Sequence, residues 1–392
     1  MRAMKIRYYL IWVLFILLSG NVSAVESPVN ERLFPIPDEI KANVEFWINI
    51  YSSYGINTII IHDDKRLDII YEVIDLDTLF NDEKISQKDR KRAINKLENR
   101  YRKILKRLAK RRCFEVPLLG AEELRVYRLF GCANDGDLYA DAVSRVRSQY
   151  GFREAFEEGI KRSGRYIGRM KAIFDAYLLP PELIALPHVE SSFNIKAYSK
   201  YGAAGMWQFI RSTGKQFLTI NYKVDERLDP EKSTVAAAKL LRRNYRELRS
   251  WPLALTAYNH GLRGMKRAVK KMGTRDIGAI VAGYESKSFK FASRNFYAEF
   301  IAALIVSNNV ETYFADLQLD RPEEYRVIKL PDHMKTVVLL EEYDLDIDEM
   351  KRLNPAVRST AISANRSLPR GYQIRLPAED VSKDEKTSVT AY

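Results

Sequence analysis

Residues 187–210 read PHVESSFNIKAYSKYGAAGMWQFI. An apolar run with helical spacing ends there at Glu190, and a turn rich in Gly and Ala follows before Trp207-Gln208-Phe209. The chain has no Asp or Glu from Ser191 to Val224, although 29% of its residues are charged. A lone carboxyl group in partly apolar surroundings has a raised pKa. Glu190 is therefore a candidate general acid, and the alternative is a surface glutamate that closes a helix.

The segment before Glu190 predicts a helix that begins at Leu179-Pro180-Pro181-Glu182, because proline suits a first turn. Pro187 predicts that this helix bends or ends close to Glu190. Ser199 lies nine residues after Glu190, which is within reach across a turn.

The turn after Ser199 has the composition of a sugar site. Gly202 and Gly205 permit a tight backbone and the close approach of a ligand. Met206 and Gln208 then offer an apolar floor and an amide group, which suit the faces and the substituents of sugar rings.

A second segment, residues 251–261, predicts an apolar helix that delivers Tyr258 and Asn259 just before Gly261. A hydroxyl and an amide at a helix end can orient an acid or hold an acetamido group. His260 could act as a base, but a lone histidine beside glycine is more often solvated.

The N-terminus predicts export. Arg2, Lys5 and Arg7 precede an apolar run of nine residues, 10–18, and a small-residue site ends at Ala24. This is the pattern of a secretory signal peptide over residues 1–24, and the run is shorter than the roughly 20 residues of a membrane-spanning helix. We therefore expect a periplasmic or cell-envelope protein, with an uncleaved membrane anchor as the alternative.

Charge and cysteine content agree with an exported protein that meets an anionic partner. The net charge is +13, and removal of residues 1–24 with their three basic residues leaves +10. This charge suits an anionic surface or polymer, and export argues against nucleic acid. Cys113 and Cys132 are either a disulfide or two free buried thiols.

Residues 25–174 predict a basic, mainly helical region with one β-hairpin. A helix is expected from Glu39 to Tyr51, and β-branched runs at 57–61 and 67–74 predict two paired strands. His62 to Arg66 would form a solvated turn between them. His62, Asp63 and Asp64 could suggest a metal site, but three consecutive residues rarely converge on one ion, so no metal or cofactor is expected.

A strongly basic helix is predicted over residues 86–112, which hold thirteen Lys or Arg and two acids. Its apolar residues recur at three- and four-residue spacing, so its other face is exposed. That face is either simply solvated or attracted to wall or lipid. Further helices are expected over residues 121–130, 140–150 and 153–177.

Four motifs together resemble the lytic murein transglycosylases of the membrane-bound D type. They are ESSFN from Glu190, SKYGAAGMWQ from Ser199, AYNHG from Ala257 and SRNFYAEFIAAL from Ser293. Their order and spacing are similar over about residues 175–310, and residues 34–76 resemble the leader region of that group. The chain differs from lipoprotein members in lacking a lipid-acceptor cysteine, and it has Ser293 where many relatives of the fold have Glu.

This resemblance implies a mainly α fold with a lysozyme-like catalytic domain over residues 175–312. The substrate would be the glycan strand of peptidoglycan, and no cofactor would be needed. Glu190 would be the single acid and base in forming a 1,6-anhydro-muramyl end. The other residues implied or predicted at the site are Ser199, Met206, Gln208, Tyr258, Asn259 and Tyr297.

The C-terminal residues 322–378 predict a β-α-α-β unit that resembles a LysM carbohydrate-binding module. Its usual Gly-Asp after the first strand is replaced by Pro331-Asp332. A structural appendage is the alternative. Residues 379–392 are polar and predicted to be disordered.

Two further functions stay open at this point. A muramidase-type hydrolase would need a second acid and would leave a reducing product end. A noncatalytic peptidoglycan-binding scaffold would use the same surface, although such a protein would not need a carboxyl group at the cleaved bond.

Overall fold

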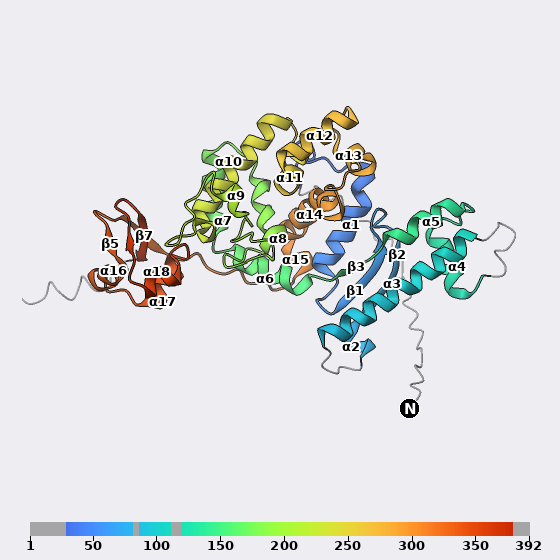
Figure 1. Ribbon diagram of the computed structural model, residues 1–392, viewed down its shortest axis with the longest axis horizontal. Coiled ribbons are helices and arrows are strands. Elements are labelled where there is room, and N and C mark those ends of the chain that lie inside the picture. The colour runs from blue at the N-terminus through green and yellow to red at the C-terminus, as the bar shows by residue number, and fades with distance from the viewer. Residues whose placement is uncertain (1–28, 81–85, 111–118, 379–392) are drawn as a thin grey trace, which may run out of the picture.

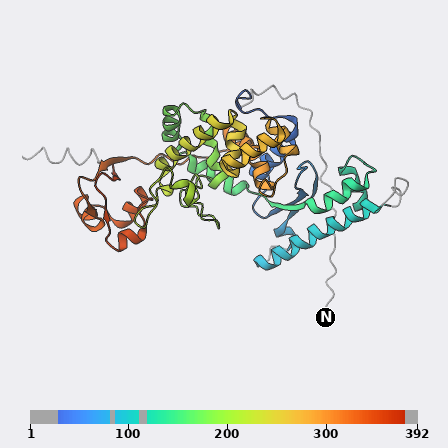
Figure 2. The same cartoon turned by 45° about the horizontal axis from the view of Figure 1, so that its top comes forward.

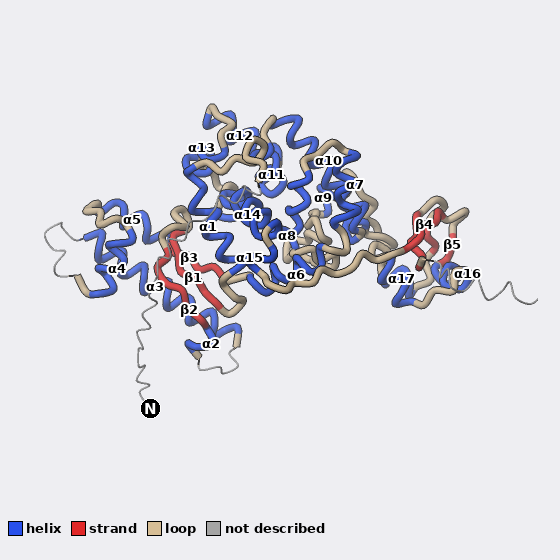
Figure 3. Tube along the Cα trace, turned by 180° about the vertical axis from the view of Figure 1, so that it is seen from behind, coloured by secondary structure: helices blue, strands red, loops and turns tan. Residues whose placement is uncertain are grey.

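The structure is a computed structural model that describes residues 29–80, 86–110 and 119–378. A body of helices lies in the middle, a small module with the C-terminal strands lies at one end, and a three-stranded sheet with α3, α4 and α5 lies at the other (Figure 1). The same order is visible after a 45° turn (Figure 2). The predicted mainly α fold is confirmed, and strands occur in two separate places (Figure 3).

The predicted β-hairpin is confirmed. Strands β1 (Thr58–Asp63) and β2 (Ile70–Asp75) pair antiparallel. A third strand, β3 (Val146–Tyr150), pairs with the other edge of β1. The prediction of one helix over residues 140–150 is therefore wrong at its end, because α5 (Gly136–Arg145) gives way to β3.

The prediction of a solvated turn at His62 is also wrong. His62 and Asp63 belong to β1, the central strand, and both side chains are buried. Burial lowers the pKa of His62 to about 4, and Arg145 forms an ion pair with Asp63 at 2.8 Å. Pairing with β3 extends β1 beyond the point where the hairpin alone would turn.

A separate core joins the sheet to four helices. One side of α3 is buried there through Tyr101 and Leu105 among others, and its opposite side is basic and exposed, as predicted. The helices are α2 (Leu76–Leu79), α3 (Gln87–Lys110), α4 (Ala121–Leu129) and α5.

The helical body has one hydrophobic core that includes residues from Val29 to Phe314. Helix α1 (Asp38–Ser52) packs against α14 (Phe291–Asn308), far away in sequence, and Asn43 donates to Asn295 at 2.8 Å. In Figure 1 the blue α1 and the orange α14 lie together. The expected domain boundary near residue 174 therefore does not divide this core.

The other helices of the body lie between residues 153 and 313. The single helix predicted over residues 153–177 is in fact two, because Gly164 to Tyr166 form a turn. These helices are α6 (Arg153–Ser163), α7 (Ile167–Ala176), α8 (Leu186–Ser191), α9 (Arg211–Gly214), α10 (Pro230–Leu248), α11 (Trp251–His260), α12 (Leu262–Met272), α13 (Ile277–Gly283) and α15 (Val310–Tyr313), with 3-10 helices at Pro181–Ala185 and Glu226–Leu228.

The C-terminal module has the predicted β-α-α-β order. Strands β4 (Tyr325–Lys329) and β7 (Gln373–Pro377) pair antiparallel, and α16 (Thr336–Glu342) and α17 (Ile347–Leu353) lie between them in sequence. Two short strands add to this order, since β5 (Met334–Lys335) pairs with β6 (Ser367–Leu368). A short helix, α18 (Ser359–Ser363), precedes β6.

Three predictions concern residues outside the described ranges: the signal segment 1–24, Cys113 of the cysteine pair, and the tail 379–392. Cys132 is described and exposed. Among the described helices, none combines the length and the apolar character needed to cross a membrane.

Candidate active site

Glu190 lies in the last turn of α8, which follows directly after the 3-10 helix at Pro181–Ala185. Pro187 stands in the first turn of α8, so it begins this helix instead of ending it. Ser192 ends the helix in the left-handed conformation, with φ of 49°. Glu190 is thus the last residue but one of this helix.

Glu190 has a strongly perturbed pKa. Burial, and then the negative charge of Glu299, raise the pKa of Glu190 to about 8. Glu190 has no ion pair to a described residue, and its side chain keeps partial contact with solvent. The direction of this shift agrees with the sequence analysis, and a carboxyl group of this kind holds a proton at neutral pH.

The second carboxyl group, Glu299, comes from α14, which packs against α8. Burial raises the pKa of Glu299 to about 8 as well, and the charge of Arg147 offsets part of the effect. Two carboxyl groups that repel each other in poorly solvated surroundings cannot both ionise easily. The pair therefore keeps a proton near neutrality.

The charge of Glu190 also acts on two tyrosines, Tyr258 and Tyr51. Burial raises the pKa of Tyr258 well above its usual value, and the charge of Glu190 adds to it. Burial also raises the pKa of Tyr51, with contributions from Glu299 and Glu190. Tyr51 comes from α1 and stacks on Phe156 with ring centroids 4.5 Å apart, so α1, α8, α11 and α14 all contribute to this site.

The Gly- and Ala-rich turn is held against α8 and α11 by hydrogen bonds to its backbone. Ser191 donates its hydroxyl to the carbonyl of Met206 at 2.8 Å. Tyr258 donates to the carbonyl of Trp207 at 2.7 Å, and the indole of Trp207 donates to Thr234 at 2.9 Å. Glu190 and the turn are thus fixed relative to each other.

Gly205 is required by this packing. Its φ is +79°, and a Cβ atom there would collide with the carbonyl oxygen of Arg227. Gln208 has φ of 46°, and its amide donates to the carbonyl of Gly205 at 2.8 Å. A glycine is needed at residue 205 for a second chain to come this close.

The other predicted site residues differ in how accessible their polar groups are. Tyr258 and Gln208 lie at the turn and are partly exposed, and Asn259 is exposed and accepts from Ser293 at 2.8 Å. The hydroxyl of Ser199 accepts from the backbone N–H groups of residues 201 and 203, so it caps its own turn.

Two residues that were predicted at the site are buried in the protein core. Met206 is fully buried in the core, so its side chain cannot be the expected apolar floor. Tyr297 is 1% exposed, and its hydroxyl donates to the carbonyl of Pro35 at 2.9 Å. Tyr297 therefore fastens the segment before α1 to α14.

Glu190, which the sequence predicts to be a lone acid, has the carboxyl group of Glu299 close enough to raise its pKa. The acids that come next in the chain are engaged elsewhere, since Asp225 pairs with Arg227 and Asp229 with Arg375. Glu299 was overlooked, although it is the only charged residue between Arg294 and Glu311. That isolation in an apolar helix is the same signal that marked Glu190.

The sequence analysis predicted a solvated His260, and this prediction is wrong. His260 is partly buried and lies edge-on to Phe289, and burial lowers its pKa. No group of three or more His, Cys, Asp or Glu able to hold a metal ion occurs in the described ranges.

The comparison with known families decides the class of this region. Residues 171–281 match the family described as the transglycosylase SLT domain. This region is thus similar to the transglycosylase SLT domain. Glu190, Gln208 and Tyr258 lie within the matched residues, and Glu299 lies after them.

Curated relatives agree with this assignment. The chain is 28% identical over 198 residues to the membrane-bound lytic murein transglycosylase D of Escherichia coli strain K12, and equally to that of strain O6:H1. The aligned part covers 48% of this chain and 41% of those relatives. A putative tributyltin chloride resistance protein of an Alteromonas species is 34% identical over 96 residues, 24% of this chain and 46% of that protein. The resemblance to lytic murein transglycosylases is confirmed.

Proposed function

We propose that this protein is a peptidoglycan lytic transglycosylase that cleaves the bond between N-acetylmuramic acid and N-acetylglucosamine. The observation that carries the proposal is the carboxyl group of Glu190, which lies in the region similar to the SLT domain and whose pKa is raised to about 8. At neutral pH such a group is protonated and ready to donate.

Glu190 would act twice in one cycle. It first gives its proton to the glycosidic oxygen as the bond to the muramyl C1 breaks. The resulting carboxylate then takes the proton from the muramyl C6 hydroxyl while that oxygen bonds to C1. The product is a 1,6-anhydro end, no water is consumed, and Glu190 regains its proton. An internal alcohol held against C1 has a large effective concentration.

The surrounding groups support this use of Glu190. Gln208, Tyr258 and Asn259 present an amide, a phenol and a second amide close to the turn, and all three keep contact with solvent. These groups suit the hydroxyl and acetamido substituents of a sugar. Ser199 contributes through the shape of its turn.

A second candidate function is favoured by Glu299. A muramidase-type hydrolase uses two carboxyl groups, one as acid and one as nucleophile or base. Glu299 is a second carboxyl group that acts electrostatically on Glu190. Its own raised pKa argues against this use, because a protonated carboxyl is neither a nucleophile nor a base.

The remaining parts of the chain fit an envelope protein that holds on to the wall. We assign residues 175–312 as the catalytic domain, together with α1, and residues 322–378 as a LysM-like module for glycan. The predicted export segment and the name of the Escherichia coli relatives support an envelope location.

The basic face of α3 gives a further reason for surface attachment. Its exposed lysines have no ion pair to a described residue, and they are Lys88, Lys91, Lys96, Lys103, Lys106 and Lys110. We expect this face to attract anionic wall polymer or lipid. Replacing four of these lysines by Gln should weaken sedimentation with isolated cell walls, and unchanged sedimentation would remove the proposal.

The test of the catalytic proposal is mass spectrometry of the muropeptides that the protein releases from purified peptidoglycan. Wild type should give 1,6-anhydro products, and Glu190→Gln should release them about 10²–10⁴ times more slowly. Glu45→Gln is the matched control, because Glu45 is exposed on α1. Reducing ends would favour the hydrolase. Binding without release by wild type would favour a noncatalytic scaffold.

A further inference from the structure

A cavity of about 660 Å³ lies between the helical body and the C-terminal module. One wall comes from α6, α7 and the loop after α8, and the other from the segment before β4, from α17 and from β7. Neither Glu190 nor Glu299 lines it. Its volume is in the range of small-molecule sites, so it is separate from the proposed active site.

The lining is strongly basic, with seven Lys or Arg side chains and three acidic ones. Each of the three acids already has an arginine partner. Arg165 pairs with Asp320 at 2.9 Å, and Arg352 pairs with Glu323. Glu231 pairs with arginines from both walls, namely Arg169 at 3.4 Å and Arg375 at 3.5 Å.

Three of the cations have no carboxylate partner among the described residues. Lys196 and Arg321 are exposed at the cavity. The guanidinium of Arg162 donates twice to the carbonyl of Ser192, at 3.0 and 2.7 Å. The cavity therefore has a surplus of positive charge that its own acids do not neutralise.

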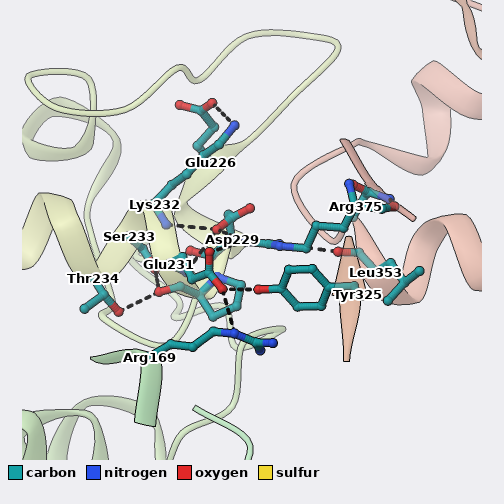
Figure 4. Close-up of polar contacts among 12 residues, drawn as sticks. Arg169, Glu226, Asp229, Glu231, Lys232, Ser233, Thr234, Tyr325, Leu353 and Arg375 are labelled. Atoms are coloured by element: carbon teal, nitrogen blue, oxygen red, sulfur yellow. Dashed lines mark hydrogen bonds and ion pairs between the residues drawn. The ribbon is translucent and has the colours of Figure 1, made fainter. Parts of the chain in front are cut away.

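The walls are held in place before any ligand arrives. Arg375 crosses from β7 to Asp229 at 2.8 Å, and the hydroxyl of Tyr325 donates to Glu231 (Figure 4). The guanidinium of Arg169 lies 4.2 Å from the centre of the Tyr325 ring. Such preorganisation lowers the entropic cost of binding.

We propose that this cavity binds carboxylate groups of the peptide stems that a peptidoglycan strand carries, a proposal that rests on the function proposed above. A cavity of about 660 Å³ has room for part of a peptide stem, which carries carboxylates and amides. Arg and Lys are the side chains that bind carboxylates. Arg162 donates to the carbonyl of Ser192, which ends α8 two residues after Glu190, so one short segment connects this cavity to Glu190. The strand would be bound by its sugar at one and by its peptide at the other.

The experiment compares two muramyl peptides by calorimetry with the full chain, one with free carboxylates and one with those carboxylates amidated. The wild type should bind the free acid and bind the amidated form much more weakly. The double variant Lys196→Gln, Arg321→Gln should bind the free acid about tenfold less tightly, and high salt should remove most of the difference. Lys171→Gln, exposed on α7 and outside the lining, is the control.

Two results would overturn the proposal: equal binding of the acid and the amide, or a double variant that binds like wild type. Capture of phosphatidylglycerol vesicles in place of the peptide would overturn it as well. Cleavage of peptide-free glycan strands is measured in parallel. If wild type binds the acid but does not cleave glycan, the proposed function fails and the carboxylate site stands. If it cleaves glycan but does not bind the acid, only the carboxylate site fails.

Discussion

The carboxyl groups of Glu190 and Glu299 have different neighbours from that of Asp225, although burial acts on the pKa of all three. Asp225 is buried, but the hydrogen bonds and charges of Arg227 and Arg358 outweigh burial and hold its pKa below the usual range. Neither Glu190 nor Glu299 has an ion pair with a described residue. Burial raises both pKa values to about 8, and the more distant charge of Arg147 offsets only part of the effect at Glu299.

This difference in neighbours corresponds to a difference in role: the paired Asp225 supports the structure, and the unpaired Glu190 is available for proton transfer. Arg227 joins Asp225 at 2.9 and 2.8 Å and also donates to the carbonyls of Gly202 and Phe209. These contacts fix both ends of the Gly- and Ala-rich turn. A carboxylate neutralised in this way cannot give up a proton at neutral pH, and a protonated, unpaired one can. The two roles can be tested by removing Arg227 in one region and the carboxyl groups of Glu190 and Glu299 in the other.

The largest effect on stability is expected from Arg227→Met. The change leaves Arg358 as the only described arginine that pairs with Asp225 and removes the guanidinium that donates to the carbonyls of Gly202 and Phe209. We expect this to cost about 3 kcal/mol of unfolding free energy. Urea denaturation at pH 7 measures it. The control is Lys266→Met, because Lys266 pairs with Glu247 on the surface and should change little.

The pH dependence of this loss is a second check on Arg227→Met. A lowered pKa means that the stabilising charge of Asp225 is present above its unfolded value of 3.8 and is lost as the pH falls through its folded value. The difference in unfolding free energy between wild type and variant should therefore become smaller below about pH 4. A constant gap would mean that the arginine acts only through its carbonyl contacts.

The sequence predicts these regions to different degrees for physical reasons. The hairpin, α1 and α3 follow from local patterns of apolar residues, and all were predicted. Strand β3 was not, because it forms by pairing with β1, from which some ninety residues separate it. The same holds for the interface at Asp229, whose partner Arg375 lies in the C-terminal module.

The candidate site was predicted where one segment contains the information. Glu190 and the turn after it were found from 24 consecutive residues. Glu299 and Tyr51 were not found, because only the packing of α14 and α1 brings them to the site. Tyr297 was named from a motif, and its burial depends on Pro35 at the opposite end of the chain.

A smaller, opposite effect on stability is expected from Glu190→Gln. Between the unfolded pKa of 4.5 and the folded value of about 8, the folded state of wild type binds the extra proton. The unfolding free energy of the wild type is therefore highest, as far as Glu190 decides it, below pH 4.5, and it declines as the pH rises toward 8. Gln cannot ionise, so the variant should be more stable at pH 8. The full pKa shift corresponds to about 5 kcal/mol, and the partial solvent contact of Glu190 reduces the expected gain to about 1–2 kcal/mol.

Thermal melts of wild type and Glu190→Gln at pH 5 and pH 8 measure this prediction. The melting temperatures should be similar at pH 5, and the variant should melt about 2–6 °C higher at pH 8. Glu45→Gln should show no such dependence. A variant less stable than wild type at both pH values would show that Glu190 is held by favourable contacts, which would contradict its role as an unpaired acid.

The smallest effect is expected from Glu299→Gln, and it decides between the two catalytic readings. If Glu299 acts only through its charge, its removal lowers the pKa of Glu190, because that charge adds to burial in raising it. The alkaline limb of the activity profile should then move to lower pH by less than about one unit, with the maximal rate kept within about threefold. If Glu299 is instead the nucleophile or base of a hydrolase, the maximal rate falls by at least about a hundredfold at every pH. The kcat profile of Glu299→Gln on peptidoglycan, with product ends identified at each pH, therefore tells whether one buried carboxyl group performs the reaction or two share it.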